Sequence, residues 1–209
     1  MNTEKIPLPT VRRLSLYKRF LEKLRELRIR STSSTPIGEY TGIPAYQVRK
    51  DLNHLGGIGK AGKGYDVRKL IESISQALRS DIPRKCVVVG LGRLGSAITG
   101  FLCERQKQFK VVAGFDTDKE KVGQSVFCVR VLHADELSRV VREKNVDVAI
   151  LTVPSAVAQQ TAEELESAGI KGILNFTPVK LSLPENMVVS SIDFSQELEI
   201  ISYLLSNPC

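Results

Sequence analysis

The sequence predicts an α/β protein with two domains, a helical N-terminal domain over residues 1–80 and a doubly wound parallel sheet over residues 81–193. The first observation is charge: residues 1–80 carry 16 Lys and Arg against 7 Asp and Glu, whereas residues 81–209 carry 14 against 16. The second is hydrophobic spacing, which is helical in the first part and alternates β-branched runs with helical segments in the second. The third is a glycine fingerprint that follows the first of these runs.

Composition restricts the class of protein further. The 209 residues carry a formal net charge of +7, and the excess of cations in the N-terminal part indicates either a polyanionic partner or a merely solvated basic surface. No apolar run approaches the ~18 residues of a membrane span. The first residues also lack the apolar segment of a signal peptide, so we expect a cytoplasmic protein that does not enter membranes.

The cysteines and histidines predict no metal site. The four cysteines include no C-x-x-C pair, and the two histidines lie far apart in the sequence. We therefore expect neither bound zinc nor a disulfide framework, and we interpret Cys86 and Cys103 as small core residues.

The N-terminal domain opens with an amphipathic helix over about residues 10–27, with apolar residues at three- and four-residue steps. A Ser/Thr-rich segment follows, and a short helix over residues 37–40 ends at Gly42. Pro44 then opens another helix. A short helix, a tight turn with glycine and a second helix form the helix-turn-helix pattern.

The stretch 45–55 predicts the second helix of this motif. Its apolar side consists of Ala45, Val48, Leu52 and Leu55. The other side carries cations, an amide and a phenol, which suit the major groove because Arg pairs with guanine and Asn with adenine. An ordinary solvated helix face is the alternative. The candidate DNA-binding residues on this helix are Tyr46, Gln47, Arg49, Lys50 and Asn53.

The segment 56–67, GGIGKAGKGYDV, resembles the glycine-rich hairpin of a winged helix-turn-helix domain. Glycines let a backbone approach phosphates, and lysines supply charge. A Walker phosphate loop is excluded because Lys63 precedes Gly64 rather than Ser or Thr. The candidate DNA-binding residues here are Lys60, Lys63 and Tyr65, and a helix over about residues 67–78 closes the domain.

The run CVVVGLGRLGSA predicts a Rossmann dinucleotide-binding domain. The β-branched strand stops at a G-x-G-x-x-G turn, a helix follows, and the next strand ends in an acid about 20 residues later. That acid can accept a hydrogen bond from the ribose 2′-OH of NADH or NAD+, and it would repel the 2′-phosphate of NADPH or NADP+. We therefore expect NADH or NAD+ as the cofactor. The candidate residues are Gly90, Leu91, Gly92, Arg93, Leu94, Gly95 and Asp116.

Alternation of strands and helices continues along the chain. Strands are predicted over residues 126–132, 146–154, 170–178 and 186–193, with helices over 134–145 and 155–169. Ligands of open parallel sheets lie outside the carboxyl ends of the strands. The residues at those ends are therefore candidates for the nicotinamide half of the cofactor, or else have only a turn role: Thr152, Val153, Pro154, Asn175, Phe176 and Asp193.

The sequence offers no catalytic machinery beside this cofactor fold. A dehydrogenase must move a proton along with the hydride. There is no convincing acid–base pair and no Tyr-x-x-x-Lys, and His133 is interpreted as a cap or surface residue. A DNA-binding module joined to a dinucleotide site without catalysis indicates a sensor rather than an enzyme.

Motifs along nearly the whole chain resemble the Rex redox-sensing transcriptional repressors of bacteria. They are KIP and RRL within 5–14, QVRKDL at 47–52, GKGYDV at 62–67, GLGRLGSA at 90–97, LTVP at 151–154, GIKGILNFTPV at 169–179 and IDF at 192–194. The resemblance implies a homodimer in which the C-terminal helix, residues 194–209, is swapped onto the partner. An apolar stripe supports this, although packing on its own subunit is the alternative: Leu198, Ile201, Leu204 and Leu205.

The resemblance also implies how such a protein works. The family binds palindromic operators when NADH is low and leaves the DNA when NADH rises. Family members often carry Tyr where this chain has Phe101, which affects how oxidised and reduced cofactor are distinguished. We expect Arg13 and Asp193 to form an ion pair between the domains. The alternatives are a small NAD-dependent oxidoreductase with an accessory nucleic-acid-binding domain, and a nucleotide- or CoA-binding regulator.

Overall fold

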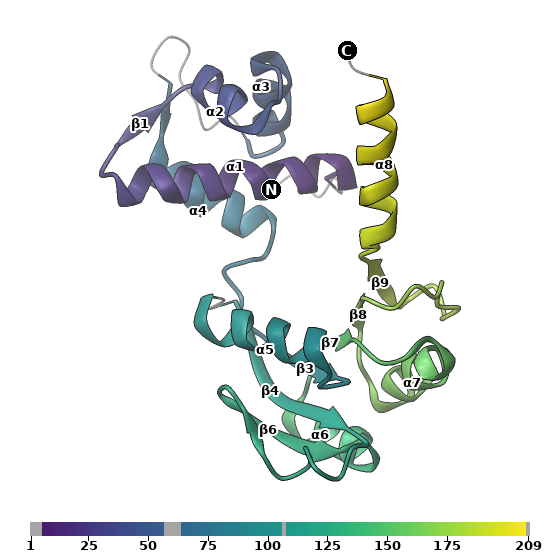
Figure 1. Cartoon of the computed structure of the whole chain (residues 1–209). Coiled ribbons are helices and arrows are strands. Elements are labelled where there is room, and N and C mark those ends of the chain that lie inside the picture. Colours follow the sequence, from purple (N-terminus) through teal and green to yellow (C-terminus); the bar gives the residue numbers. More distant parts are fainter. Residues whose placement is uncertain (1–5, 57–63, 106–107, 208–209) are drawn as a thin grey trace. The chain divides into compact units, whose positions relative to one another are not determined.

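The structure is a computed structural model that describes residues 6–56, 64–105 and 108–207. The chain divides into two compact units, Met1–Ile82 and Pro83–Cys209. They are called the N-terminal unit and the C-terminal unit, and each is described by itself (Figure 1).

The N-terminal unit is a small helical domain with one short antiparallel ribbon. Its elements are α1 (Leu8–Glu26), β1 (Ser31–Thr32), α2 (Ser34–Thr41), α3 (Ala45–Asn53), β2 (Tyr65–Asp66) and α4 (Val67–Ala77). The helical spacing of apolar residues predicted this core, in which every helix buries at least one side chain completely: Leu14, Tyr17 and Leu21 of α1, Ile37 of α2, Val48 of α3, and Leu70 and Ile74 of α4.

The turn between α2 and α3 depends on two glycines. Gly42 ends α2 in the left-handed conformation, with φ of +70°, which costs a glycine little. Gly38 lies so close to the next segment that a Cβ there would sit 2.5 Å from the carbonyl oxygen of Ile43. α3 then begins after Pro44, so the helix-turn-helix pattern is present as expected.

The ribbon pairs β1 with β2, with Thr32 opposite Tyr65 and Ser31 opposite Asp66. The hydrophobic pattern did not predict β1, because a two-residue strand among serines and threonines has no periodic signal. Tyr65 is half-buried at the edge of the core. Lys60 and Lys63 lie outside the described residues.

The C-terminal unit is a seven-stranded sheet covered by helices on both faces. Its elements are β3 (Arg84–Val89), α5 (Arg93–Arg105), β4 (Phe109–Asp116), β5 (Ser125–Val126), β6 (Val129–His133), a 3-10 turn (Ala134–Glu136), α6 (Leu137–Lys144), β7 (Val148–Leu151), α7 (Ser155–Ala168), β8 (Gly172–Asn175), β9 (Val188–Ser191) and α8 (Phe194–Ser206).

The strand order is that of a Rossmann fold. The sheet runs β5-β6-β4-β3-β7-β8-β9, and all neighbours are parallel except β5 and β6. The order therefore reverses between β3 and β7, and ligands of such sheets bind at this point. α6 and α7 cover one face with a core that includes Phe115 and Leu165, while α5 covers the other face over Val88 and Ile150 (Figure 1).

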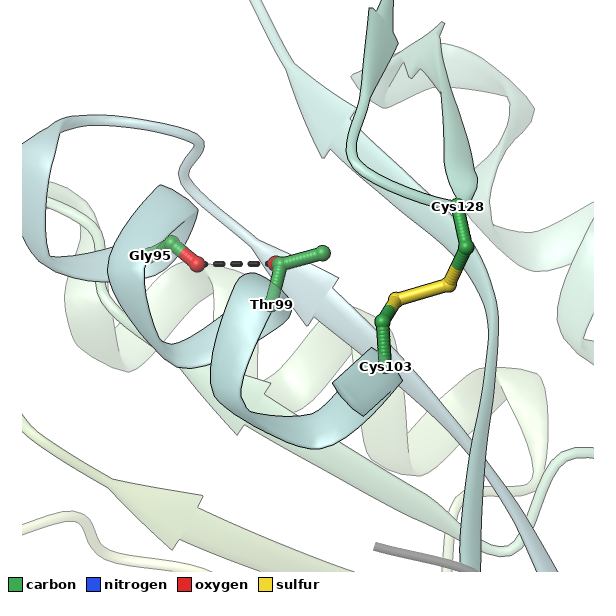
Figure 2. The surroundings of a disulfide bond; sticks show 4 residues. All are labelled: Gly95, Thr99, Cys103 and Cys128. Carbon is green, nitrogen blue, oxygen red and sulfur yellow. Dashed lines mark hydrogen bonds between the residues drawn. A yellow bond between two sulfur atoms is a disulfide. The ribbon is translucent and has the colours of Figure 1, made fainter. Parts of the chain in front are cut away.

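Two details differ from the sequence prediction. Residues 126–132 are not one strand, because β5 turns back onto β6 at Phe127 and Cys128. Cys103 is not an inert core residue, because it forms a disulfide with Cys128 (Figure 2). The spacing of the cysteines gave no sign of this pair, since the hairpin that brings Cys128 to α5 was missed. Cys86 is buried and free, as expected.

The C-terminal helix leaves its apolar side uncovered. None of the residues of α8 is buried, and the apolar stripe predicted from the sequence is exposed by 52–78%. β9 is exposed along its whole length as well. Within the described parts of the chain, no helix has the length and apolar character needed to cross a membrane.

Candidate functional site

The turn between β3 and α5 is shaped by its three glycines. Gly90 has φ of +91°, and a Cβ there would lie 2.7 Å from the carbonyl oxygen of Thr152. A Cβ on Gly95 would overlap the carbonyl oxygen of Gly90, so the first turn of α5 fits closely against the loop. Gly92 has nothing within 4 Å of its Cβ position. The loop thus leaves open space where a pyrophosphate would approach the start of α5.

Thr152 joins this turn to the end of β7. Its hydroxyl lies 2.8 Å from the carbonyl oxygen of Gly90 and 3.0 Å from that of Val89, so it can donate to either. The strand reversal point is therefore fixed by a side chain as well as by the sheet. Val153 is half-buried and Pro154 is exposed at the start of α7.

Asp116 lies at the end of β4 and faces the same turn. It accepts hydrogen bonds from the backbone N–H of Leu91 (2.8 Å) and of Asp118 (2.9 Å), and from Nζ of Lys121 (3.1 Å). Burial alone would raise the pKa of Asp116, but these hydrogen bonds and the charge of Lys121 lower the pKa overall. The carboxylate is thus ionised and fixed, with acceptor capacity left on Oδ1 for a ribose hydroxyl.

The other residues of the glycine fingerprint offer backbone N–H groups rather than side chains to the site. Leu91 is buried in the core beneath α5, whereas Arg93 and Leu94 are exposed at the start of this helix. Phe101 is exposed by 51% on the same helix. These positions leave the first turn of α5 open to an anion.

Asn175 has a structural role in this unit. It is fully buried, and its amide donates to the carbonyl oxygen of Val179 (2.9 Å) and to Ser191 Oγ (3.3 Å). Its carbonyl oxygen accepts from the N–H and the hydroxyl of Thr177. All four hydrogen-bonding positions of this side chain are in use. The side chain therefore shapes the loop after β8 and has no capacity left for a ligand, which is the turn role weighed above.

Phe176 and Asp193 border the same end of the sheet. Phe176 is half-buried, with its ring centroid 6.3 Å from that of Phe194. Asp193 is exposed and caps α8, because its Oδ1 accepts from the N–H of Ser195 (2.9 Å). Asp193 is thus held at the point where α8 begins.

In the N-terminal unit, Asp51 ties α1 to α3. Arg13 donates to both of its carboxylate oxygens, from Nε at 2.6 Å and from Nη2 at 2.7 Å. Tyr17 donates at 2.8 Å and Gln47 at 2.9 Å, and Thr10 lies at 3.3 Å. Only 1% of the Asp51 side chain is exposed. Burial acts to raise its pKa, but the hydrogen bonds and charge of these partners hold the pKa below the ordinary value.

The predicted recognition helix presents its polar side to solvent. Tyr46 is exposed by 65%, and Arg49, Lys50 and Asn53 are exposed too. Arg49 is oriented by a hydrogen bond from Nη1 to Ser34 Oγ (2.9 Å) at the start of α2. Gln47 differs, because its amide is directed to Asp51.

Sequence reasoning missed the residues that hold the named ones in place. Asp51 and Gln47 are four apart on one helix, a spacing that permits a hydrogen bond, but the partners from α1 are far away in sequence. Lys121 follows Asp116 by five residues, but the sequence did not distinguish it from the other cations nearby as the partner of Asp116. Long-range contacts of this kind require the fold.

A helix-turn-helix unit joined to a Rossmann unit with an ordered glycine turn and acid defines a class of protein, the nucleotide-responsive DNA-binding regulators. The family model "CoA binding domain" matches residues 81–179, and "Putative DNA-binding protein N-terminus" matches residues 5–53. Both matches agree with that class.

The chain is 41% identical to the redox-sensing transcriptional repressor Rex of Carboxydothermus hydrogenoformans, over 95% of this chain and 96% of the relative. It is 40% identical to the Rex repressor of Halalkalibacterium halodurans, over 99% of both chains. The chain belongs to the Rex family of redox-sensing transcriptional repressors. The relatives are named as repressors, and the family is regulatory rather than enzymatic.

Solved structures agree with this assignment. The fold matches the Rex-family repressor RSP in complex with NAD+ and operator DNA with a TM-score of 0.90 and 32% identity, over 96% of this chain and 93% of RSP. The match to RSP in complex with NADH has a TM-score of 0.87 and 31% identity, over 96% and 94% of the two chains.

Proposed function

We propose that this protein is a homodimeric repressor that binds palindromic operator DNA when NADH is low and releases the DNA when NADH binds. The main support is that an ionised Asp116 faces the glycine turn in a chain that also has a helix-turn-helix unit. RSP, which shares the fold over 96% of this chain, has been solved with both forms of the cofactor and with operator DNA. We propose that the protein acts in the cytoplasm, where both ligands occur.

We propose that the cofactor lies across the strand reversal point. The backbone of Leu91, Arg93 and Leu94 at the start of α5 would bind the pyrophosphate, with the three glycines giving it access. Asp116 would accept the ribose 2′-OH, which favours NADH and NAD+ over NADPH. Thr152, Val153, Pro154, Phe176 and Asp193 would border the nicotinamide, while Asn175 supports the loop behind it.

We propose that α3 reads the operator in the major groove. Tyr46, Arg49, Lys50 and Asn53 would contact the DNA directly, because all four are exposed on one helix. Gln47 would act mainly through Asp51, which fixes α3 to α1. The segment with Lys60, Lys63 and Tyr65 would bind neighbouring phosphates as a wing.

The dimer is proposed from the uncovered apolar surface of the C-terminal unit. Leu198, Ile201, Leu204 and Leu205 form a stripe that is exposed by half or more, and a solvent-exposed stripe of this kind requires burial. A swapped α8 would bury it on the partner. Two such subunits would place two copies of α3 on a palindrome, about 34–36 Å apart.

Coupling between the ligands is proposed to pass through Arg13. In the N-terminal unit Arg13 binds Asp51 through Nε and Nη2, and we propose that its remaining Nη1 group pairs with Asp193 in the DNA-competent state. Asp51 would then link the position of Arg13 to the recognition helix. The resemblance implies a Tyr hydroxyl where this chain has Phe101, so discrimination between NADH and NAD+ would rest on other contacts.

A mobility-shift titration tests the function. The protein is bound to a palindromic operator and titrated with NADH, NAD+ and NADPH. Release by NADH at much lower concentration than by the other two is expected. Turnover of NADH with a substrate, without an effect on DNA, would instead favour the small oxidoreductase.

A further inference from the structure

A disulfide joins the fingerprint helix to the neighbouring hairpin. Cys103, in the last turn of α5, is bonded to Cys128 in the β5–β6 turn, with Cα atoms 6.2 Å apart. Figure 2 shows Gly95, Thr99 and Cys103 at successive four-residue steps along the helix. Thr99 is fully buried and donates to the carbonyl oxygen of Gly95 (2.8 Å). One rigid helix therefore connects the disulfide to the turn of the proposed cofactor site.

The other end of the disulfide is connected to Asp116. The segment after Asp116 carries Lys121, which pairs with it at 3.1 Å. That segment is fixed to β6, because Gly123 N–H donates to the carbonyl oxygen of Val131 and Val131 N–H donates to that of Gln124, both at 2.9 Å. The disulfide thus closes a loop of covalent and hydrogen-bonded structure that contains the glycine turn and the acid.

The bond is accessible to reagents in solution. Cys128 is exposed and Cys103 is half-buried. Phe127, beside Cys128, adopts φ of +53° and its ring lies against Gly100, an unfavourable backbone conformation for an aromatic residue. The backbone at Phe127 is therefore strained, and Cys128 is the other residue of the two-residue turn between Val126 and Val129.

The compartment in which a repressor acts determines whether this disulfide is stable. On the function proposed above, on which this inference rests, the protein shares a compartment with DNA, where thiols are kept reduced. Disulfides in such proteins are usually transient and serve catalysis or redox sensing. We propose that Cys103 and Cys128 are a reversible thiol–disulfide pair that sets the affinity of the dinucleotide site for NADH. The disulfide form binds NADH more tightly, because the helix and the acid are already held in place.

The oxidant is a small-molecule disulfide. The exposed Cys128 thiolate attacks one sulfur of that disulfide, forms a mixed disulfide and displaces one small thiolate. The Cys103 thiolate then attacks Sγ of Cys128 and displaces the second. The two protons lost by the cysteines end on the two small thiols, and two electrons pass from the protein to the oxidant. Reduction is the reverse exchange.

The full-length protein is equilibrated with glutathione disulfide or with dithiothreitol, and each form is freed of reagent. After unfolding, the four cysteines should give four thiols in the reduced form and two in the oxidised form. Peptide mapping should show the Cys103–Cys128 link. NADH titration of the two forms should then show about fivefold or more tighter binding to the disulfide form. Operator release should need correspondingly less NADH.

Matched variants separate the pair from other effects of the reagents. Cys128→Ser changes an exposed side chain, and its NADH affinity should be that of the reduced protein under both treatments. Cys128→Ala should behave in the same way. Cys209→Ser removes a thiol outside the pair and should respond like the wild type.

The results that overturn the switch are specific. They are a thiol count of four after glutathione disulfide, equal NADH affinity in both forms, or a wild-type response in Cys128→Ser. NADH binding by neither form would overturn the proposed function as well, whereas equal binding by both would leave that function intact.

Discussion

At the scale of single residues, two carboxylates organise the two units, the buried Asp51 and the half-buried Asp116. Asp51 accepts from Arg13, Tyr17 and Gln47, and Asp116 accepts from two backbone N–H groups and Lys121. Burial acts to raise the pKa of both carboxyl groups, but hydrogen bonds and the charges of their partners lower the pKa overall. A carboxylate held in this way contributes orientation as well as stability, because its partners lose their fixed positions when it is removed.

Asp51→Asn should destabilise the protein by about 2–3 kcal/mol at neutral pH, slightly less than a fully buried pair, because Arg13 is partly exposed. The pKa of Asp51 is lower in the folded protein than its ordinary value of 3.8. Its contribution is therefore present above pH of about 4 and is lost as pH falls through the folded-state pKa. Urea unfolding across this range should show the difference between wild type and variant shrink toward acid.

The control for this measurement is Asp81→Asn, an exposed acid of the same unit that should match the wild type within about 0.5 kcal/mol. A pH-independent difference between wild type and Asp51→Asn would show that the charge of Asp51 is not what matters.

Asp116→Ala should weaken NADH binding about tenfold or more, because a hydrogen bond to a charged group is lost. The variant should also show a smaller preference for NADH over NADPH, since the charge that repels the 2′-phosphate of NADPH disappears. Calorimetric titration with both cofactors measures the two effects. Glu185→Gln is the control, because it removes a negative charge from an exposed side chain of the same unit. If Asp116→Ala leaves the ratio of NADH affinity to NADPH affinity unchanged, Asp116 does not contact the ribose.

At the scale of elements, α3 and α8 each expose a surface that the fold does not use. Both are amphipathic, but α3 buries its apolar side in the N-terminal unit, whereas α8 buries none of its residues. The exposed side of α3 is polar and cationic, which suits phosphates and base edges. The exposed side of α8 is apolar, which suits another protein surface.

Arg49→Ala and Lys50→Ala should weaken operator binding and leave NADH affinity unchanged. A base contact by Arg49 would cost about 1–3 kcal/mol and relax specificity at one position. A phosphate contact would instead reduce the salt dependence by about one unit of slope. Binding measured over a series of salt concentrations and operator variants distinguishes the two. Arg68→Ala on α4 removes the same charge from an 86% exposed side chain and serves as control. Full affinity in both α3 variants would exclude α3 from the DNA interface.

Leu198→Glu or Leu205→Glu should shift the protein from dimer to monomer in sedimentation experiments, because a charge would enter the buried surface of the dimer. Ser206→Glu adds the same charge outside the stripe and should leave the dimer intact. A dimer of unchanged affinity in both leucine variants would mean that α8 does not form the interface.

The sequence predicted elements with a periodic or glycine signal and missed those without one. The fingerprint from Gly90 to Gly95 and the acid at Asp116 came from spacing, and the structure brings them together. β1 and the β5–β6 turn were missed because a two-residue strand has too little sequence to show a period. The Asp51 network and the Cys103–Cys128 bond join segments far apart in sequence, so local patterns could not reveal them.

At the scale of the whole molecule, function requires the two units to respond to each other. NADH must bind the DNA-incompetent dimer more tightly than the DNA-competent one, because equal affinity for both would shift nothing. Arg13 in the N-terminal unit and Asp193 at the start of α8 are the proposed point of communication. The factor by which NADH weakens DNA binding must equal the factor by which DNA weakens NADH binding.

Arg13→Ala should lower operator affinity and leave NADH affinity equal or slightly higher, because the DNA-competent state loses a contact. The double-mutant cycle with Asp193→Ala isolates the pair. We expect the effects on DNA binding to be non-additive by about 0.5–3 kcal/mol. Additive effects would show that the Arg13–Asp193 pair carries no coupling. The effect of Arg13→Ala would then be measured in the Asp51→Asn variant, where any loss of the effect belongs to the Arg13–Asp51 contact within the N-terminal unit.

The sheet of the C-terminal unit ends differently on its two sides, and this bears on how the chain avoids aggregation. On one side, β5 runs antiparallel beside β6 and covers its edge with Ser125 and Val126. On the other side, β9 is the last strand, and among the described residues no strand pairs with its outer edge. Unpaired edge strands template association with other chains. Misassembly during folding should therefore begin at β9, and early formation of the dimer beside it would protect the newly made protein.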